Sequence, residues 1–177
     1  MVATARLSVA EIRSKEVEFI EKVRSRAARV FEVSPEQVIV RDILPKDDFG
    51  LDDNKWVFSL GTAGDYNKII DVTAPQNKVF IVYGLKILSK DVDHEVTIAK
   101  VQKGNEVLDV ITLEKAYNGE NYPEIIFRSP IEINPNDTLK VYLYVPSGVT
   151  TPKTFSVAVL GYTAEKLGET ITSALEQ

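Results

Sequence analysis

The stretch Asn134-Pro-Asn-Asp-Thr-Leu-Lys-Val-Tyr-Leu-Tyr-Val145 decides the fold class of this chain. It begins with four turn-forming residues, and from Leu139 onward Leu or Val occupies every second position. A period of two is typical of a strand that buries one face and exposes the other. The pattern therefore predicts a half-buried β-strand from Thr138 to Val145 that follows a tight turn.

Similar β-type runs fill most of the chain on both sides of this strand. Turn signals rich in Pro, Gly and Asn separate them, without intervening helical patterns. Many short strands at close spacing are typical of an antiparallel sandwich or barrel. The sequence therefore predicts a mainly β fold, an antiparallel β-sandwich or jelly-roll-like barrel. The predicted strands are 55–60, 67–73, 78–88, 94–103, 106–113, 124–133, 138–145 and 154–163, and a further strand-like run covers 38–44.

A long amphipathic helix is predicted before Ser34-Pro35, which together signal the start of a single further turn. The apolar stripe of this helix needs a surface to cover, either on a neighbouring subunit or on the chain's own sandwich. Four-residue spacing of Leu167, Ile171 and Leu175 predicts a short C-terminal helix. We expect a helical arm over 1–34, a β-sandwich domain over 35–163 and a C-terminal helix or tail over 164–177. The arm residues predicted to form an interface are Ile12, Arg13, Phe19, Ile20, Val23, Arg24 and Val30.

The formal net charge of −5 hides an asymmetry between the arm and the rest of the chain. Between Arg6 and Arg29 there are seven basic and four acidic residues, so this segment carries +3 and the remainder carries −8. An acidic body repels nucleic acid, and the glutamates of the arm weaken the field of its arginines. The charges therefore favour docking of the arm on a body or a neighbouring subunit over binding of nucleic acid.

Several classes of protein are made improbable by what the sequence lacks. The chain contains no cysteine, which removes disulfides, thiolate catalysis and cysteine-based metal sites. No apolar run approaches the ~18 residues that a membrane span requires, and no apolar signal-peptide core follows Met1. We therefore expect no membrane partner, and we expect the chain to remain inside the cell when it is made.

Two segments contain side chains with oxygen or nitrogen ligand atoms. For each segment, two interpretations remain: a metal site or an ordinary solvated loop. His94 is the single histidine and lies in Asp91-Val-Asp-His-Glu95, between two predicted strands. The acidic loop Asp47-Asp-Phe-Gly-Leu-Asp-Asp-Asn54 lacks the ligand spacing of a calcium-binding loop. No Gly-x-Ser-x-Gly elbow supports a triad through His94, and Gly61-Thr-Ala-Gly64 lacks the lysine and the helix of a phosphate-binding loop. We therefore predict no catalytic residue, no metal site and no cofactor.

Aromatic residues indicate a candidate recognition surface. Trp56 lies in a predicted strand, where it could stack on a sugar ring or simply belong to the core. Tyr117 and Tyr122 flank a loop with Asn and Gly, a composition that suits recognition and also suits a long hairpin loop. These three aromatics are the predicted recognition residues.

Two stretches resemble strand-start segments of β-sandwich virion proteins. They are Thr73-Ala-Pro-Gln-Asn-Lys-Val-Phe-Ile-Val-Tyr-Gly84 and Asn134-Pro-Asn-Asp-Thr-Leu-Lys-Val-Tyr142. The resemblance is to accessory, decoration or minor capsid proteins of tailed viruses, and it covers about residues 67–160. It implies a non-enzymatic subunit that packs on a capsid lattice, and no catalytic residue carries over from it.

The leading hypothesis is thus a structural subunit of a larger assembly, with copies of itself or other capsid subunits as partners and the virion as its location. The second hypothesis is a ligand-binding β-sandwich module that recognises carbohydrate. The third is an enzyme that uses carboxylates alone, since small barrels can host such chemistry.

Overall fold

The structure is a computed structural model that describes residues 9–52, 54–89, 95–113 and 123–168, with side chains from Ser14 onward. Its elements confirm the predicted mainly β fold, which a long helix precedes. The helices are α1 (Val9–Val30), the 3₁₀ turn η1 (Pro35–Gln37) and α2 (Pro45–Phe49). The strands are β1 (Val38–Asp42), β2 (Val57–Leu60), β3 (Asp65–Thr73), β4 (Lys78–Ile87), β5 (Ile98–Lys103), β6 (Glu106–Thr112), β7 (Glu124–Ile133), β8 (Thr138–Val145) and β9 (Lys153–Lys166).

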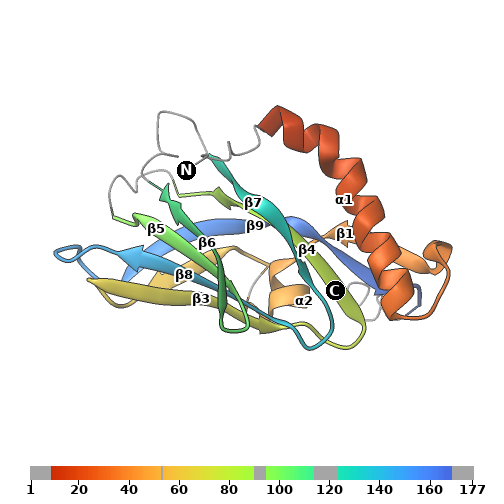
Figure 1. Ribbon diagram of the computed structural model, residues 1–177. Helices are drawn as coiled ribbons and strands as arrows, with labels where there is room; N and C mark the ends of the chain where they lie inside the picture. Colours follow the sequence, from red (N-terminus) through yellow and green to blue (C-terminus); the bar gives the residue numbers. More distant parts are fainter. Residues whose placement is uncertain (1–8, 53, 90–94, 114–122, 169–177) are drawn as a thin grey trace.

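The strands form two antiparallel sheets (Figure 1). The first sheet has the order β1-β9-β4-β7, and β2 also pairs with β9. The second sheet has the order β3-β8-β5-β6. One core cluster contains buried side chains of both sheets, among them Phe80 and Phe155 of the first sheet and Leu143 of the second. Burial of these apolar faces is the main favourable term in folding.

Strand β8 shows how the sequence pattern becomes structure. Burial alternates along it, with Leu139, Val141, Leu143 and Val145 buried and the intervening residues half-exposed. The buried side chains point between the sheets, so the others point away from the sandwich. This confirms the predicted alternation and defines an outer face for the second sheet.

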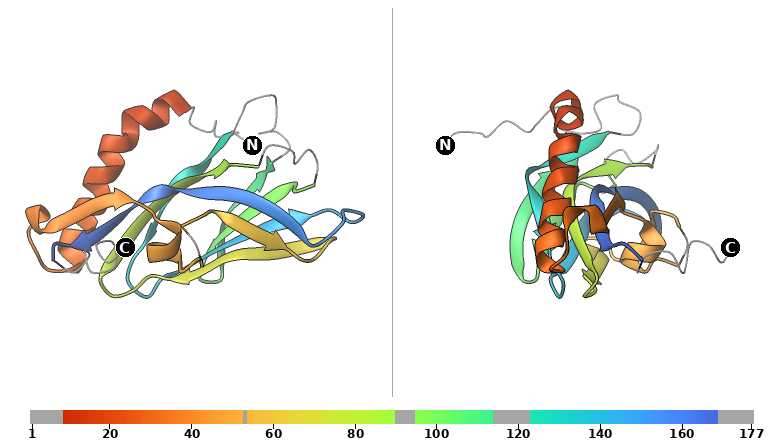
Figure 2. Two further views of the ribbon diagram at one scale, coloured as in Figure 1. Left: turned by 180° about the vertical axis from the view of Figure 1, so that it is seen from behind. Right: turned by 90° about the vertical axis from the view of Figure 1, so that its right-hand side faces the viewer.

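Helix α1 lies on the outer face of the first sheet, beside β1, β9 and β4 (Figures 1 and 2). Phe19 stacks on Tyr83 with ring centroids 5.3 Å apart, and Val23 and Ala27 are buried in the same cluster. Outside this contact, the Lys22 Nζ atom lies 2.7 Å from Glu132 Oε1. The apolar stripe of the helix is therefore covered by the chain's own sheet.

The strands β4 and β9 approach closely where the register of their pairing shifts. Tyr83 is the extra residue of β4 between Val82 and Gly84, which pair with neighbouring residues of β9. A Cβ atom on Gly161 would lie 2.3 Å from the carbonyl oxygen of Ile81, closer than any side chain tolerates. Glycine is needed here because the two backbones touch, and the bulge turns Tyr83 toward α1.

Two boundaries differ from the sequence prediction. The segment predicted as an acidic loop begins with α2, because Pro45 starts a helical turn and Gly50, at φ 64°, ends it. Strand β9 continues to Lys166, beyond the predicted end of the β domain at residue 163. The predicted C-terminal helix falls mostly on residues 169–177, which lie outside the described residues. No helix within the described ranges is long and apolar enough to cross a membrane.

Candidate functional site

The outer face of the second sheet carries a distinctive group of exposed and half-exposed side chains, and we call it the open face. Tyr66 of β3 is paired with Tyr144 of β8, and Lys68 is paired with Tyr142. Lys100 of β5 is paired with Tyr142 from the other side. The open face consists of Tyr66, Lys68, Asp71 and Thr73 from β3, Thr138, Lys140, Tyr142 and Tyr144 from β8, Ile98, Lys100 and Gln102 from β5, and Val107, Val110 and Thr112 from β6.

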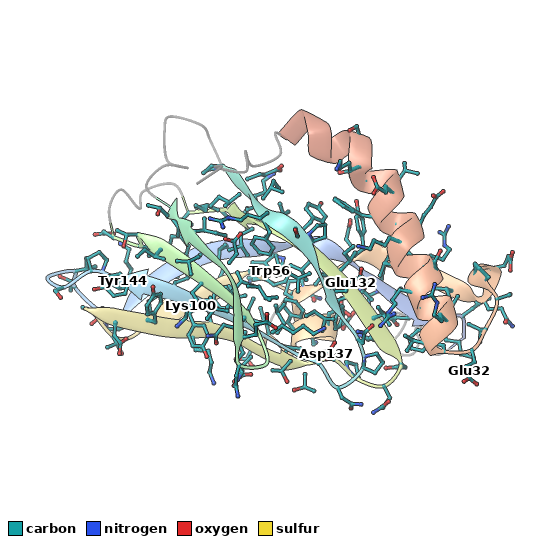
Figure 3. All side chains as sticks on the ribbon, in the orientation of Figure 1. Glu32, Trp56, Lys100, Glu132, Asp137 and Tyr144 are labelled. Atoms are coloured by element: carbon teal, nitrogen blue, oxygen red, sulfur yellow. The ribbon has the colours of Figure 1, made fainter. Side chains whose placement is uncertain are left out.

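Lys100 sits between two tyrosine rings of this face. Its ammonium nitrogen is 4.2 Å from the ring centroid of Tyr66 and 4.5 Å from that of Tyr142. The rings of Tyr66 and Tyr144 also meet edge-on, with centroids 5.2 Å apart. Figure 3 labels Lys100 and Tyr144 on this sheet. Cation–π contacts hold a lysine in place without a carboxylate. The cluster is therefore a rigid aromatic surface that presents a positive charge.

The open face is positively charged, whereas the chain as a whole is acidic. It holds three lysines and one aspartate, which gives a formal charge of +2 against −5 for the whole chain. Asp71 is paired with Lys68 at 2.5 Å, which leaves the positive charge on Lys100 and Lys140. A surface of this kind attracts an acidic partner.

Apolar side chains extend the open face to its edge strand β6. Val107 is 49% exposed and Val110 is 50% exposed. The edge itself is protected against simple strand addition, because β6 has a register shift near Leu108 and the inward-pointing carboxylate of Asp109. The face of this sheet is therefore a better contact surface than its edge.

A hollow of about 530 Å³ lies between β6 and β7, the edge strands of the two sheets. Leu108, Phe127 and Ile131 line it together with charged residues of both strands. Asp109 closes it, accepting hydrogen bonds from the Val110 amide at 2.9 Å and the Arg128 amide at 3.4 Å. The carboxylate of Asp109 thus joins the two sheets at this side of the sandwich.

Asp48, in the acidic segment considered as a metal site, belongs to a buried ionic cluster. Arg41 donates two hydrogen bonds to Asp48, at 2.7 and 3.0 Å, and Lys78 donates a third at 2.7 Å. The Leu44 amide donates a fourth at 2.7 Å, and Glu165 completes the cluster through Arg41. Burial opposes ionisation of Asp48, but the hydrogen bonds from Arg41 and Lys78 outweigh it and hold the pKa of this carboxyl below its usual value.

This cluster anchors α2 to β1, β4 and β9. Among the described residues, no group of three His, Asp or Glu side chains is arranged to hold a metal ion. His94 and its neighbours in 90–94 lie outside the described residues.

The structure describes one of the three predicted recognition residues. Trp56 is half-buried and packs against the core, with its ring edge-on to Phe49 at a centroid distance of 5.5 Å. Tyr117 and Tyr122 lie outside the described residues. Sequence reasoning missed the tyrosines of β3 and β8, although their alternation with buried aliphatic residues already placed Tyr142 and Tyr144 on the exposed side of a strand.

The predicted arm residues divide into three groups. Phe19 and Val23 are buried against the chain's own sheet, and Ile20 and Val30 pack on the same cluster. For these four residues the chain's own first sheet supplies the apolar surface that the stripe requires. Arg24 is half-buried and lines a shallow hollow beside Pro35 and Glu36. The side chains of Ile12 and Arg13 lie outside the described residues.

No protein-family model matches the chain, and no curated protein matches it. Among solved structures, the chain is similar to the VP2 subviral particle of infectious bursal disease virus, with a TM-score of 0.37 and 10% identity over 77% of this chain and 35% of that one. The Gt strain of this virus gives a TM-score of 0.36 and 14% identity over 75% of this chain and 32% of that one. The Gx strain gives a TM-score of 0.36 and 17% identity over 73% of this chain and 33% of that one. The chain spans about a third of the length of these structures.

Proposed function

We propose that this protein is a non-enzymatic structural subunit of a larger assembly, that this assembly is a virion, and that the open face is its contact surface. The proposal rests on a difference between the outer faces of the two sheets. The outer face of the first sheet is covered by α1, whereas that of the second exposes tyrosines, lysines and valines.

The composition of the open face suits protein contacts. Tyrosine contributes a large, rigid surface at low entropic cost, and it is enriched in interfaces. Val107 and Val110 add exposed apolar area beside the tyrosines. Lys100 is already held between two rings, so little rotamer freedom remains to be lost when a partner binds.

The virion part of the proposal rests on the resemblance of residues 67–160 to β-sandwich virion proteins. Those residues include every strand of the open face except the first two residues of β3. The two stretches that carry the resemblance form the start of β4 and the turn into β8.

Fractionation of the native source tests this proposal. We expect the chain to sediment with large particles visible by electron microscopy. Within these particles, Lys68, Lys100 and Lys140 should be protected from acetylation, whereas Lys46, an exposed residue of α2, should react as it does in the free chain. A chain that stays in the free-protein fraction would refute a structural role.

A carbohydrate-binding module is the second candidate, because the open face gathers three tyrosines. Sugar stacking needs a free ring face, and Lys100 lies over one face of both Tyr66 and Tyr142. The structure therefore favours a protein partner. Glycan binding that is lost in Tyr142→Ala and kept in Trp56→Ala would instead favour the carbohydrate-binding module.

A further inference from the structure

We propose that the open face of one copy receives the exposed ridge of helix α1 from a second copy, in a head-to-tail contact. The ridge consists of Val17, Glu18 and Glu21. This inference rests on the proposed function as an assembly subunit, and it names the partner and the contact.

The ridge lies on the side of α1 that faces away from the chain's own sheet. Val17 and Glu21 are four residues apart and Glu18 and Glu21 are three apart, so all three share one side of the helix. They lie opposite Phe19 and Val23, which are buried on the first sheet. Val17 is 64% exposed, the highest value among the large apolar side chains that the structure describes as exposed.

The two surfaces have complementary charge. The described side chains of α1 change sign along the helix: Ser14 to Glu21 carry three glutamates and one lysine, whereas Lys22 to Val30 carry four basic residues and no acid. The acidic half bears the ridge and is complementary to the open face, which has a formal charge of +2. Glu18 and Glu21 would lie near Lys100 and Lys140, with Val17 against the valines of β6. Opposite charges of this kind set the orientation and the partner of a contact.

Charge also decides against the alternative in which two open faces meet. Such a contact would place Lys100 and Lys140 of one copy near the same residues of the next, and like charges brought together are unfavourable. The edge of β6 is protected by its register shift and by Asp109. A contact between unlike surfaces is therefore favoured, and such a contact propagates into a ring or a filament.

The geometry repeats a contact already present within the chain. The inner stripe of α1 covers the outer face of the first sheet. In the proposed contact its outer ridge covers the second sheet of the neighbour, so that each α1 lies between two sheets. The layers would then alternate as helix, sheet and sheet along the assembly.

Charge reversal in the full chain tests the contact by sedimentation velocity over a concentration series. We expect the wild-type mass to rise with concentration. Lys100→Glu and Glu21→Lys should each weaken association by about tenfold or more. An equimolar mixture of the two variants should recover it, as should the double variant in one chain, because a reversed face then meets a reversed ridge.

Lys140→Glu provides a second face variant in case Lys100→Glu disturbs the tyrosines. Lys46→Glu and Glu32→Lys are the matched controls, since both residues are exposed and lie outside the two surfaces. Thermal unfolding checks that each variant is folded. The controls should associate like the wild type.

Three results would overturn the inference: a wild-type chain that stays monomeric at about 0.5 mM, association that survives Glu21→Lys, or single variants that fail to complement each other. A monomeric pure chain that nevertheless sediments with native particles would refute this contact and leave the assembly role standing. A chain absent from native particles would refute the assembly role itself.

Discussion

At the residue scale, Asp48 is the side chain whose environment differs most from what its sequence neighbourhood indicates. It lies in an acidic stretch, yet its carboxylate is buried and accepts hydrogen bonds from Arg41, Lys78 and the Leu44 amide. Removing one partner from a buried ionic group leaves the remaining charges without compensation. Asp48 therefore contributes to stability through the two cations that it neutralises.

Asp48→Asn should lower the free energy of unfolding by about 3 kcal/mol, because Arg41 and Lys78 would face a neutral amide in a buried site. Urea unfolding followed by the fluorescence of Trp56, the single tryptophan, measures the change. Asp71→Asn is the control, since Asp71 and Lys68 form an exposed pair and the midpoint should stay unchanged. Equal effects of the two substitutions would show that the buried cluster adds nothing.

The same carboxylate predicts a pH dependence. The pKa of Asp48 is lower in the folded chain than the value of about 3.9 expected in the unfolded chain. Its stabilising contribution is therefore complete above about pH 5 and is lost as the pH falls through the folded-state pKa. The difference in melting temperature between wild type and Asp48→Asn should stay constant from pH 7 to about 5 and shrink below about pH 4. A difference independent of pH would contradict this assignment.

At the scale of elements, helix α1 is attached to the first sheet through aromatic packing. Phe19 stacks on Tyr83, and the ring centroid of Tyr83 lies 6.0 Å from that of Tyr162. Burial under the helix, followed by the nearby Tyr162, raises the pKa of Tyr83 above its usual value. The state of this tyrosine therefore reports whether the helix is in place.

Phe19→Ala should destabilise the chain by about 3 kcal/mol, because it leaves a cavity under the helix. It should also bring the alkaline titration of Tyr83 closer to that of a solvated tyrosine, as measured by absorbance at high pH. Val17→Ala is the matched control on the exposed side of α1 and should change neither quantity. A normal Tyr83 titration in the wild type would contradict the packing of α1.

At the scale of the whole molecule, the two outer faces of the sandwich differ in role. One is closed by α1, and the other presents lysines and tyrosines on a chain with a net charge of −5. A contact of lysines with glutamates is screened by salt, with a Debye length of about 10 Å at 0.1 M and about 3 Å at 1 M.

Raising NaCl from about 0.05 M to about 0.5 M should therefore weaken self-association several-fold, as sedimentation velocity would show. Val17→Ala should weaken association by a factor that does not change with salt, since it removes only apolar contact. Association that strengthens with salt would indicate an apolar contact elsewhere on the surface.

Much of this architecture could be predicted from the sequence, because the signals that specify strands and the long helix are local. The alternation from Leu139 to Val145 predicted β8 at the bounds that the structure shows. The further turn predicted at Ser34-Pro35 is also present as η1, where the Ser34 amide donates a hydrogen bond to Gln37 Oε1 at 3.2 Å. Period and turn chemistry act over a few residues, so a sequence displays them directly.

Only the tertiary structure decided what those elements do. Tyr66, Lys100 and Tyr142 come from three strands and meet through strand pairing, which no local pattern specifies. The ionic cluster around Asp48 draws on four elements, so no local pattern in the acidic stretch indicates it. The sequence by itself determined that an amphipathic helix precedes a β-sandwich. Packing decided that the helix closes one sheet of its own chain and leaves the other exposed, because long-range contacts follow from how whole faces fit together.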